Sequence, residues 1–464
     1  MHSRWMIRAA LLLMALAASA QPSPEMRKRI EGTIAAFNGT AHDFEKYAQE
    51  HYAKEFLAQR TAEQRAALFA RLQQDFGKLG AVSVERKSPD SVAIAVKGTT
   101  GMRGQLILRH EPAPSYRISG LEMRVGGGDN EKPDLPPVPV RGTMNAAELT
   151  AALDPYLKNL QAASKFDGAV LVVRDGVTLF EKAYGYANRA DKVPNTVATR
   201  FNVGSIVKEF TKVAVGRLAA EGKLSLDDTL GRHIPDHPNA TAQKATIAQL
   251  LDHTAGLGDF MSPEFRATAM GRLRSNRDWY KLAASRPMTF DPGARRQYCN
   301  NCYITLGEII ERVSGMPYEQ YIAKHVFEPA GMKTAGFFHT DGVEPSVATG
   351  YTTAHGPLRS SVHLRGAAGS AAGSAYASAG DLLAFDNAWR DGKLLDPKWT
   401  GWSFDGAAPA TGRVTTPLGY AGGSEGVNAT VESGGKWTVV VLANIDPPAA
   451  EDLGQAIYRA LGGD

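Results

Sequence analysis

The chain has 464 residues, of which 43% are hydrophobic and 22% are charged, and its formal net charge is +4. At roughly 150 residues per domain this length predicts two or three domains, and the composition is typical of a soluble protein with a large core. The charge is too small and too evenly spread to indicate a nucleic-acid partner, so no nucleic-acid binding is expected.

The first 20 residues have the layout of a secretory signal peptide. Arg4 and Arg8 precede an apolar run that begins at Ala9, and an Ala-Ser-Ala sequence ends at Ala20, where cleavage is expected. The apolar run is too short for a comfortable membrane span. We therefore expect a periplasmic or secreted protein with no membrane span after signal cleavage. The alternative is an N-terminal anchor that stays uncleaved.

Residues 21–125 are predicted to form a small α+β domain. The segment from 24 to about 78 has helical character, and four alternating segments follow it: AVSVERK, SVAIAVKG, RGQLILRHE and YRISGLEMRV. Helices followed by an antiparallel sheet give a cystatin-like outline, which carries no function by itself. Glycine and proline are dense in 126–144, which we interpret as a linker.

Residues 145–464 form the second predicted domain. It opens with a helix and then a hairpin, whose turn is Asp175-Gly176. A helix follows from Ser205 and stops at Gly222. Its apolar residues recur at helical spacing and predict a buried stripe, formed by Val203, Val207, Phe210, Ala214 and Leu218.

The rest of this domain is predicted to mix helices with two late strands. Helices are expected at TIAQLLDH, CYITLGEIIERVSG and SAGDLLAFDNAWRDG, the last with a capping box at Ser378 and Asp381. The strands GVNATVE and WTVVVLAN and a helix from about Ala449 end the chain. Strands at both ends of the domain predict one sheet whose edges come from distant parts of the sequence.

The spacing of Ser205 and Lys208 is the first chemical signal. Three residues apart on a helix, the two side chains share a face. A serine that attacks an acyl carbon needs a proton acceptor and donors for the oxyanion, which a desolvated lysine and a helix N-terminus can supply. The same pattern recurs as Ser433 and Lys436 in a predicted hairpin turn, where we interpret it as chance. Helix capping by Ser205 is the plain alternative.

A second element is needed to complete proton transfer. Tyr298 and Asn300 flank Cys299 in a loop immediately before a predicted helix, where side chains can be aimed into a cleft. A phenolate can accept the serine proton, and an asparagine can hold a substrate amide. Tyr186 and Asn188 repeat the spacing but lie in the early hairpin, upstream of the serine, so Tyr298 is preferred.

Six stretches spread along nearly all of 160–445 resemble, in order, segments of the serine β-lactamase and penicillin-binding-protein superfamily. They are FDGAVLVVRDGVTLFEKAYGYANR, TRFNVGSIVKEFTKVAVGRLAAEGKLSLDDTL, TIAQLLDHTAGLGDF, QYCNNCYITLGEIIERVSGMPYEQYI, AGSAYASAGDLLAFDNAW and GYAGGSEGVNATVESGGKWTVVVLAN. The resemblance is greatest to the class C β-lactamase-related branch of esterases and D-aminopeptidases. It implies an α/β β-lactamase-like domain, in which helices flank an antiparallel sheet and a helical subdomain completes the cleft.

The resemblance also assigns roles to residues. It implies that Ser205 is the acylated nucleophile, that Lys208 shares its proton network and that Tyr298 is the general base. Asn300 would line the substrate site.

The third motif of the family is altered here. Where Lys-Thr-Gly or a His-x-Gly equivalent is usual, this chain has Tyr420-Ala421-Gly422, followed by Gly423. Backbone N–H groups of Ser205 and Gly423 would form the oxyanion hole, and glycine permits the close approach. The cation that commonly faces a substrate carboxylate is absent, although Tyr420 could still donate a hydrogen bond. We therefore expect ester or amide hydrolysis rather than efficient β-lactam hydrolysis.

No metal or organic cofactor is implied. Cys299 and Cys302 are too few ligands for a zinc site and are interpreted as either a local disulfide or two free thiols. His253 resembles a structural histidine of the family rather than a base. The predicted partner is a small-molecule ester, amide or peptide substrate. A non-catalytic receptor for cell-wall or peptide ligands on the same fold is the alternative.

Overall fold

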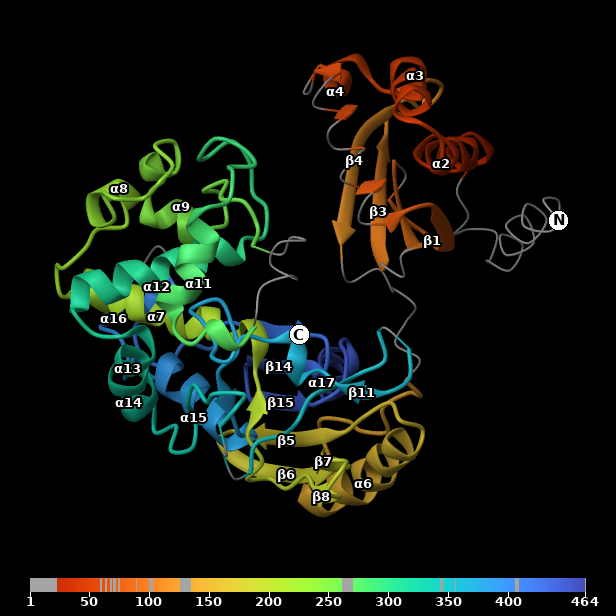
Figure 1. Cartoon of the computed structure of the whole chain (residues 1–464). Helices are drawn as coiled ribbons and strands as arrows, with labels where there is room; N and C mark the ends of the chain where they lie inside the picture. The colour runs from red at the N-terminus through yellow and green to blue at the C-terminus, as the bar shows by residue number, and fades with distance from the viewer. Residues whose placement is uncertain are drawn as a thin grey trace. The chain divides into compact units, whose positions relative to one another are not determined.

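The structure is a computed structural model of the chain (Figure 1). It describes residues 23–463, apart from 59–60, 63–64, 67–68, 70–71, 74–75, 89, 100–102, 126–134, 261–269, 343, 345, 355 and 405–408. The predicted signal peptide and residues 126–134 of the predicted linker lie outside the described residues. The chain divides into two compact units, Met1–Leu135 and Pro136–Asp464.

The first unit is a four-stranded antiparallel meander with helices packed against it. Its strands follow one another in sequence order, β1(Leu79–Ser88), β2(Ser91–Gly98), β3(Arg103–His110) and β4(Ile118–Val125). Among the residues that the structure describes, its helices include α2(Pro24–Phe37), α3(Ala41–His51) and α4(Lys54–Leu57). Ser23 caps α2, and Thr40 forms a capping box with Asp43 on α3. Residues of the helices and of the sheet share one apolar core, which includes Ile30, Phe44 and Ile94. This arrangement confirms the α+β prediction.

The second unit is built on a five-stranded antiparallel sheet. Its strand order is β13(Leu418–Ser424), β14(Val427–Gly434), β15(Trp437–Ala443), β5(Gly168–Arg174) and β6(Val177–Tyr184). The β5–β6 turn has the positive φ values of a tight hairpin, 51° at Asp175 and 77° at Gly176. Strand β15 pairs with β5 from Trp437↔Arg174 to Ala443↔Gly168. The edge strands β13 and β6 therefore come from distant parts of the sequence, as predicted, and the pairing of β15 with β5 at the centre joins the two ends of the unit.

Helices cover both faces of this sheet. On one face α17(Ala449–Ala460) lies against β14 and β15, where Gly454 sits next to Thr430 and Val441. On the other face α15(Ala379–Arg390) packs through Phe385 into a core that includes Val440 and Leu171. The capping box of Ser378 and Asp381 at the start of α15 is present as predicted.

A group of helices forms the helical subdomain, seen in green beside the sheet in Figure 1. Its central member is α12(Asn300–Ser314), which contacts α7(Val207–Ala220), α9(Ile247–Leu251) and α11(Asn276–Ala284). Further helices in the described part of the second unit are α6(Ala146–Ala162), α8(Leu230–His233), α13(Tyr318–Ile322), α14(Glu328–Ala330) and α16(Pro397–Ser403). Its short strands are β7(Tyr186–Asn188), β8(Val193–Pro194), β9(Phe201–Asn202), β10(Tyr351–Thr352), β11(Arg359–Ser360) and β12(Tyr376–Ala377). An antiparallel sheet flanked by helices, with a helical subdomain, is the fold that was predicted.

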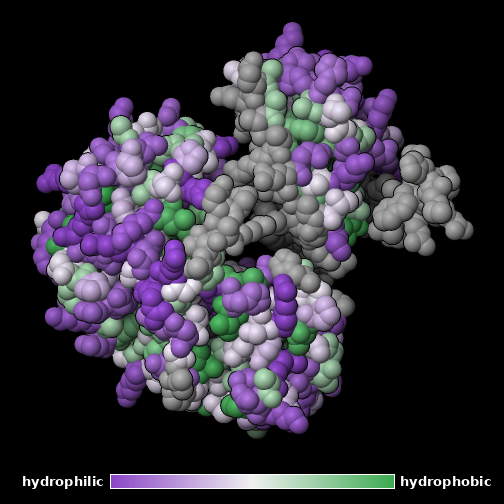
Figure 2. Space-filling model, in the orientation of Figure 1, coloured by the Kyte–Doolittle hydropathy of each residue, from purple (hydrophilic) through white to green (hydrophobic). Residues whose placement is uncertain are grey.

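Hydrophilic side chains predominate on the visible surface of the helical subdomain in Figure 2. Among the residues that the structure describes, no helix has both the length and the apolar character needed to cross a bilayer. Within the same residues, no three His, Cys, Asp or Glu side chains are grouped so that they could hold a metal ion.

Candidate active site

Ser205 lies in a tight turn between a strand and a helix. The sequence predicted that the helix starts at Ser205, whereas a 3-10 turn over Gly204–Ile206 precedes α7, which begins at Val207. Gly204 has a φ of +53°, a conformation that favours glycine, and its N–H donates to Asn202 Oδ1 at 2.9 Å. The predicted apolar stripe anchors this turn, since Val203, Val207 and the residues that follow along it are fully buried.

Three segments far apart in the sequence meet at the Ser205 hydroxyl. Lys208 Nζ lies 3.0 Å from Ser205 Oγ, and Tyr298 donates to the same oxygen at 2.7 Å. Lys208 Nζ is also 2.9 Å from Asn300 Oδ1 and 2.6 Å from the Ala372 carbonyl oxygen. The structure therefore brings Ser205, Lys208, Tyr298 and Asn300 into one cluster, with distances suited to proton transfer.

Burial changes the proton affinity of Lys208. Its side chain is 4% exposed, and this desolvation lowers the pKa to about 7, although the carboxylates of Glu209 and Asp259 act in the opposite sense. The amine also lies over the aromatic rings of Tyr298 and Tyr303, 4.9 and 5.6 Å from their centroids. Near neutral pH a large share of Lys208 is therefore a neutral amine that can accept a proton.

The hydrogen-bond partners of Lys208 fit that neutral form. A neutral amine has two N–H groups and one lone pair. In the structure Nζ donates to Ser205 Oγ as well as to the Asn300 and Ala372 oxygens. When Lys208 is neutral, the Asn300 and Ala372 oxygens can accept its two N–H groups, and its lone pair can then accept the Ser205 hydroxyl proton.

Tyr298 is a proton donor in the resting site. Burial raises its pKa, while its hydrogen bond with Ser205 acts in the opposite sense. The residue is 55% exposed, so solvent reaches the ring and limits that rise. The phenol is therefore neutral at pH 7, and a phenolate is not available at rest to act as the first base.

His253 supports Tyr298 from one side and does not contact Ser205 in this arrangement. Its ring lies 4.9 Å from the Tyr298 ring at an angle of 31°, and its Nδ1 accepts the Cys299 N–H at 3.2 Å. Burial, followed by the charge of Lys208, lowers the pKa of His253 to about 4. A neutral, buried imidazole agrees with the structural role expected for it.

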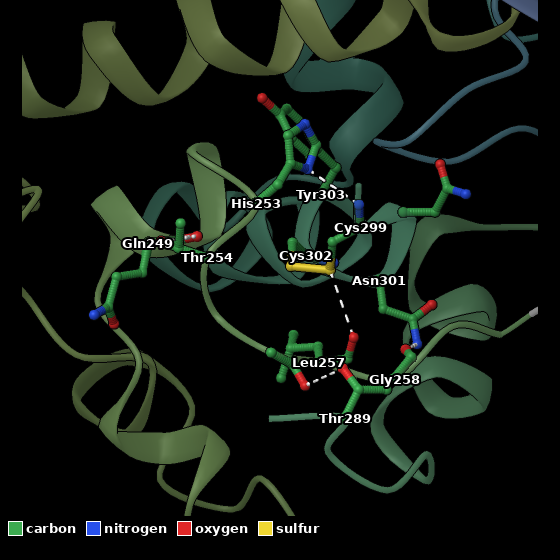
Figure 3. The surroundings of a disulfide bond; sticks show 12 residues. Gln249, His253, Thr254, Leu257, Gly258, Thr289, Cys299, Asn301, Cys302 and Tyr303 are labelled. Atoms are coloured by element: carbon green, nitrogen blue, oxygen red, sulfur yellow. Dashed lines mark hydrogen bonds between the residues drawn. A yellow bond between two sulfur atoms is a disulfide. The ribbon is translucent and has the colours of Figure 1, made fainter. Parts of the chain in front are cut away.

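Cys299 and Cys302 form a disulfide, which decides between the two alternatives that the sequence left open (Figure 3). Their Cα atoms are 5.3 Å apart. Cys299 is the N-cap of α12, and Cys302 is in the first turn of that helix.

Glycines let the edge strand β13 approach the Ser205 turn. A Cβ atom added to Gly204 would lie 2.8 Å from Gly423 N, and a Cβ atom on Gly422 would overlap Val203 O and Ser205 N. The backbone N–H groups of Ser205 and Gly423 are consequently close neighbours, as an oxyanion hole requires. The structure therefore places Gly422 and Gly423 beside the Ser205 turn.

The prediction that Tyr420 binds substrate is wrong for this structure. Tyr420 is 7% exposed, and its hydroxyl donates to Asp386 Oδ1 at 3.3 Å. Asp386 is itself paired with Arg390 inside the core, at 3.0 Å. Burial, together with the Asp386 charge, raises the pKa of Tyr420. The alternation of side chains along β13 turns this residue into the core.

The two rival patterns are not at the site. Ser433 donates to Asp386 Oδ2 at 2.7 Å, and Lys436 lies over the Trp437 ring, so the second Ser-x-x-Lys is structural. Tyr186 belongs to β7, where Asn188 donates to the Asp191 side chain at 2.7 Å.

The sequence did not reveal the contribution of the loop that carries Ala372. The carbonyl oxygen of Ala372, in a Gly/Ala/Ser-rich segment, is a direct partner of Lys208. Thr211 helps to hold the loop, since its hydroxyl donates to Ala371 O at 2.8 Å and lies 2.7 Å from Tyr318 OH. A backbone carbonyl leaves no signal in residue types.

A cavity of about 510 Å³ lies elsewhere, between the β14–β15 turn and the end of α15. Its basic side chains have partners within the unit: Arg390 binds Asp386, and Arg413 binds Asp391 at 2.6 Å. It contains no residue of the Ser205 cluster, and its volume alone does not indicate a function.

Comparison with known proteins agrees with this geometry. The family description "Beta-lactamase" matches residues 153–464. Among curated proteins, the penicillin-binding-protein relative PbpX of Bacillus subtilis (strain 168) is 33% identical over 323 residues, 66% of this chain and 77% of PbpX. Esterase EstB of Burkholderia gladioli is 30% identical over 280 residues, 53% of this chain and 71% of EstB. A penicillin-binding protein of Bacillus halodurans has a solved structure with a TM-score of 0.59 and 29% identity, covering 65% of this chain and 99% of that protein.

Proposed function

Since the chain belongs to the beta-lactamase family of serine hydrolases, we propose that it cleaves ester or amide bonds through an acyl-enzyme on Ser205 and that it acts after export. One observation carries the proposal: the Ser205 hydroxyl lies within hydrogen-bond distance of both Lys208 and Tyr298. The signal-peptide layout of residues 1–20 supports export, as does a buried disulfide, which persists in oxidising compartments.

The cluster suggests an order of proton transfers. Neutral Lys208 accepts the Ser205 proton as Oγ attacks the acyl carbon, and the N–H groups of Ser205 and Gly423 stabilise the oxyanion. Tyr298 then gives its proton to the leaving alcohol or amine and is reprotonated by Lys208. A water molecule releases the acyl group by the reverse transfers. This order assigns the first-base role to Lys208 and a relay role to Tyr298.

The buried Tyr420 favours substrates without a carboxylate next to the reacting bond. Tyr420 stands at the motif position where the family commonly has a cation, and its hydroxyl is committed to Asp386. A carboxylate-bearing β-lactam would therefore lack its usual partner at this position. Neutral esters and amides need none, and EstB is a relative named as an esterase.

Ser205→Ala is expected to abolish turnover. Wild-type protein should react with a fluorophosphonate probe and hydrolyse short p-nitrophenyl esters, D-amino-acid amides or a chromogenic cephalosporin. The variant should be unlabelled and at least about 10⁴-fold slower, because the nucleophile is gone. Mass spectrometry of the labelled peptide locates the adduct. Absence of labelling in folded wild-type protein would favour the receptor alternative.

The rate of acylation should rise with pH through neutrality. Lys208 loses its proton as the pH increases past its pKa of about 7, so kcat/KM for a neutral ester should increase between pH 6 and 8 and then level off. The measurement is kcat/KM from pH 6 to 9 with a substrate that does not titrate. A decrease over pH 6 to 8 would contradict the assignment of Lys208 as the first base.

A further inference from the structure

A disulfide lies inside the segment that supplies two residues of the active-site cluster. Cys299 is directly between Tyr298 and Asn300, and it is bonded to Cys302, three residues on in the first turn of α12. Both cysteines are buried, with Cys299 6% exposed and Cys302 fully covered. The disulfide therefore closes a small covalent ring around the start of the helix.

Each residue beside Cys299 makes a contact that the proposed chemistry needs. Tyr298 donates to Ser205 Oγ at 2.7 Å, and Asn300 Oδ1 accepts from Lys208 Nζ at 2.9 Å. A shift of the Cys299 backbone would move both contacts together. Misplacement of reacting groups by about 1 Å can reduce a rate by 10²-fold.

Noncovalent contacts hold the residues on either side of Tyr298, so the position of Tyr298 depends mainly on these neighbours. His253 accepts the Cys299 N–H at 3.2 Å and, through its carbonyl oxygen, the Gln297 N–H at 3.0 Å. Farther along, Tyr303 donates to Leu251 O at 3.1 Å. Tyr298 lies between these anchors with 55% of its surface exposed, so little packing restricts its ring on the solvent side.

We propose that the Cys299–Cys302 disulfide is a positioning element, which holds Tyr298 and Asn300 in register with Ser205 and Lys208. The oxidised chain is then the fully competent form of the enzyme. This inference rests on the proposed hydrolase function. A dithiol reductant would break the S–S bond, deliver two electrons and two protons to give two thiols, and itself become a disulfide. Without the covalent ring, the first turn of α12 can fray and release both contacts.

The double variant Cys299→Ser/Cys302→Ala removes the disulfide but keeps a side chain that can cap the helix. Serine keeps the N-cap acceptor that Cys299 Sγ now offers to the Cys302 N–H at 3.0 Å. Ile309→Val is the matched control, because Ile309 is fully buried in the same helix and two turns from the disulfide. It should lower the melting temperature without loosening the segment.

We expect the double variant to lose ten- to a hundredfold in kcat and in the rate of fluorophosphonate labelling, with KM for a p-nitrophenyl ester within about twofold of wild type. Ile309→Val should keep kcat within about twofold. Wild-type protein whose two thiols have been released by a dithiol, and counted with a thiol reagent, should show the same loss and recover on reoxidation. This second measurement holds even if the double variant does not fold.

The outcomes separate this inference from the function on which it rests. If wild-type protein is labelled at Ser205 and both the double variant and the reduced protein keep the wild-type kcat, the disulfide has no positioning role and the hydrolase proposal stands. A parallel fall of kcat and melting temperature that Ile309→Val reproduces in full would reduce the disulfide to a general stabilising element. If oxidised wild-type protein neither reacts with the probe nor hydrolyses any substrate, both proposals fail.

Discussion

Lys208→Met should reduce kcat/KM at pH 8 by about 10³-fold or more, because it removes the group that accepts the Ser205 proton. Methionine is close to lysine in length and is apolar, so the packing around position 208 is retained. The loss should appear in kcat and in the labelling rate rather than in KM. Fluorophosphonate labelling followed over time measures the acylation step directly.

The same substitution should stabilise the fold at neutral pH. The pKa of Lys208 is about 7 in the folded protein against 10.5 for an unperturbed lysine. The unfolded chain therefore binds more protons between these pH values, and the cost of burying Lys208 is fully present below pH 7 and disappears as the pH rises toward 10.5. That cost is about 5 kcal/mol, which the three hydrogen bonds of the amine offset in part. We expect a net gain of about 1–3 kcal/mol on substitution.

Lys212→Met is the control for both effects. Lys212 lies one turn further along α7, with its amine over the Trp402 ring. It should keep its activity and gain no stability. Denaturant unfolding at pH 7 and pH 9.5 tests the sign of the stability change, because the gain in the free energy of unfolding from Lys208→Met should be smaller at the higher pH. If Lys208→Met were inactive but also less stable than wild type at pH 7, the claim that burial of Lys208 destabilises the fold at neutral pH would be wrong.

Gly422→Ala should lower kcat by about 10²- to 10³-fold, the effect of losing one oxyanion donor. Its Cβ atom would overlap the backbone at Val203 O and Ser205 N, and neither backbone atom can rotate away. Strand β13 would have to move outward, which carries Gly423 N away from the oxyanion. KM for a small neutral ester should change little. The measurement is kcat and KM beside wild type, with circular dichroism to confirm folding.

Gly419→Ala on the same strand is the matched control. Its Cβ atom would meet the far end of the Glu432 side chain, which can rotate away. This variant should keep kcat within about threefold. If Gly422→Ala were equally active, the assignment of Gly423 N–H as an oxyanion donor would be wrong.

Much of the fold could be predicted because its signals are local. The Asp175-Gly176 turn, the capping box at Ser378 and the four alternating strands of the first unit each depend on neighbouring residues. Strands at both ends of the second unit predicted one sheet with edges from distant sequence, whereas the pairing of β15 with β5 was seen only in the structure. The candidate site was predictable for a different reason: Ser205, Lys208, Tyr298 and Asn300 are reactive side chains at recognisable spacing.

The remaining features depend on orientation and on backbone atoms. We predicted that Tyr420 lines the cleft because of its position in the third motif. The glycines around it leave no alternation of apolar and polar side chains, so the sequence did not indicate which face of the strand carries the Tyr420 side chain. Every residue has a backbone carbonyl, so the sequence could not single out that of Ala372 as a partner of Lys208. The proton affinities of Lys208 and Tyr298 depend on desolvation, which requires the packed structure.

The pairing of β5 with β15 has a consequence for synthesis of the chain. The hairpin of β5 and β6 leaves the ribosome well before its central neighbour β15, which lies far downstream in the sequence. Until then one edge of the hairpin is unpaired, and β13, with the glycines that face Ser205, does not yet exist. A nascent chain is consequently unable to complete the Ser205 site before β13 and β15 have both left the ribosome.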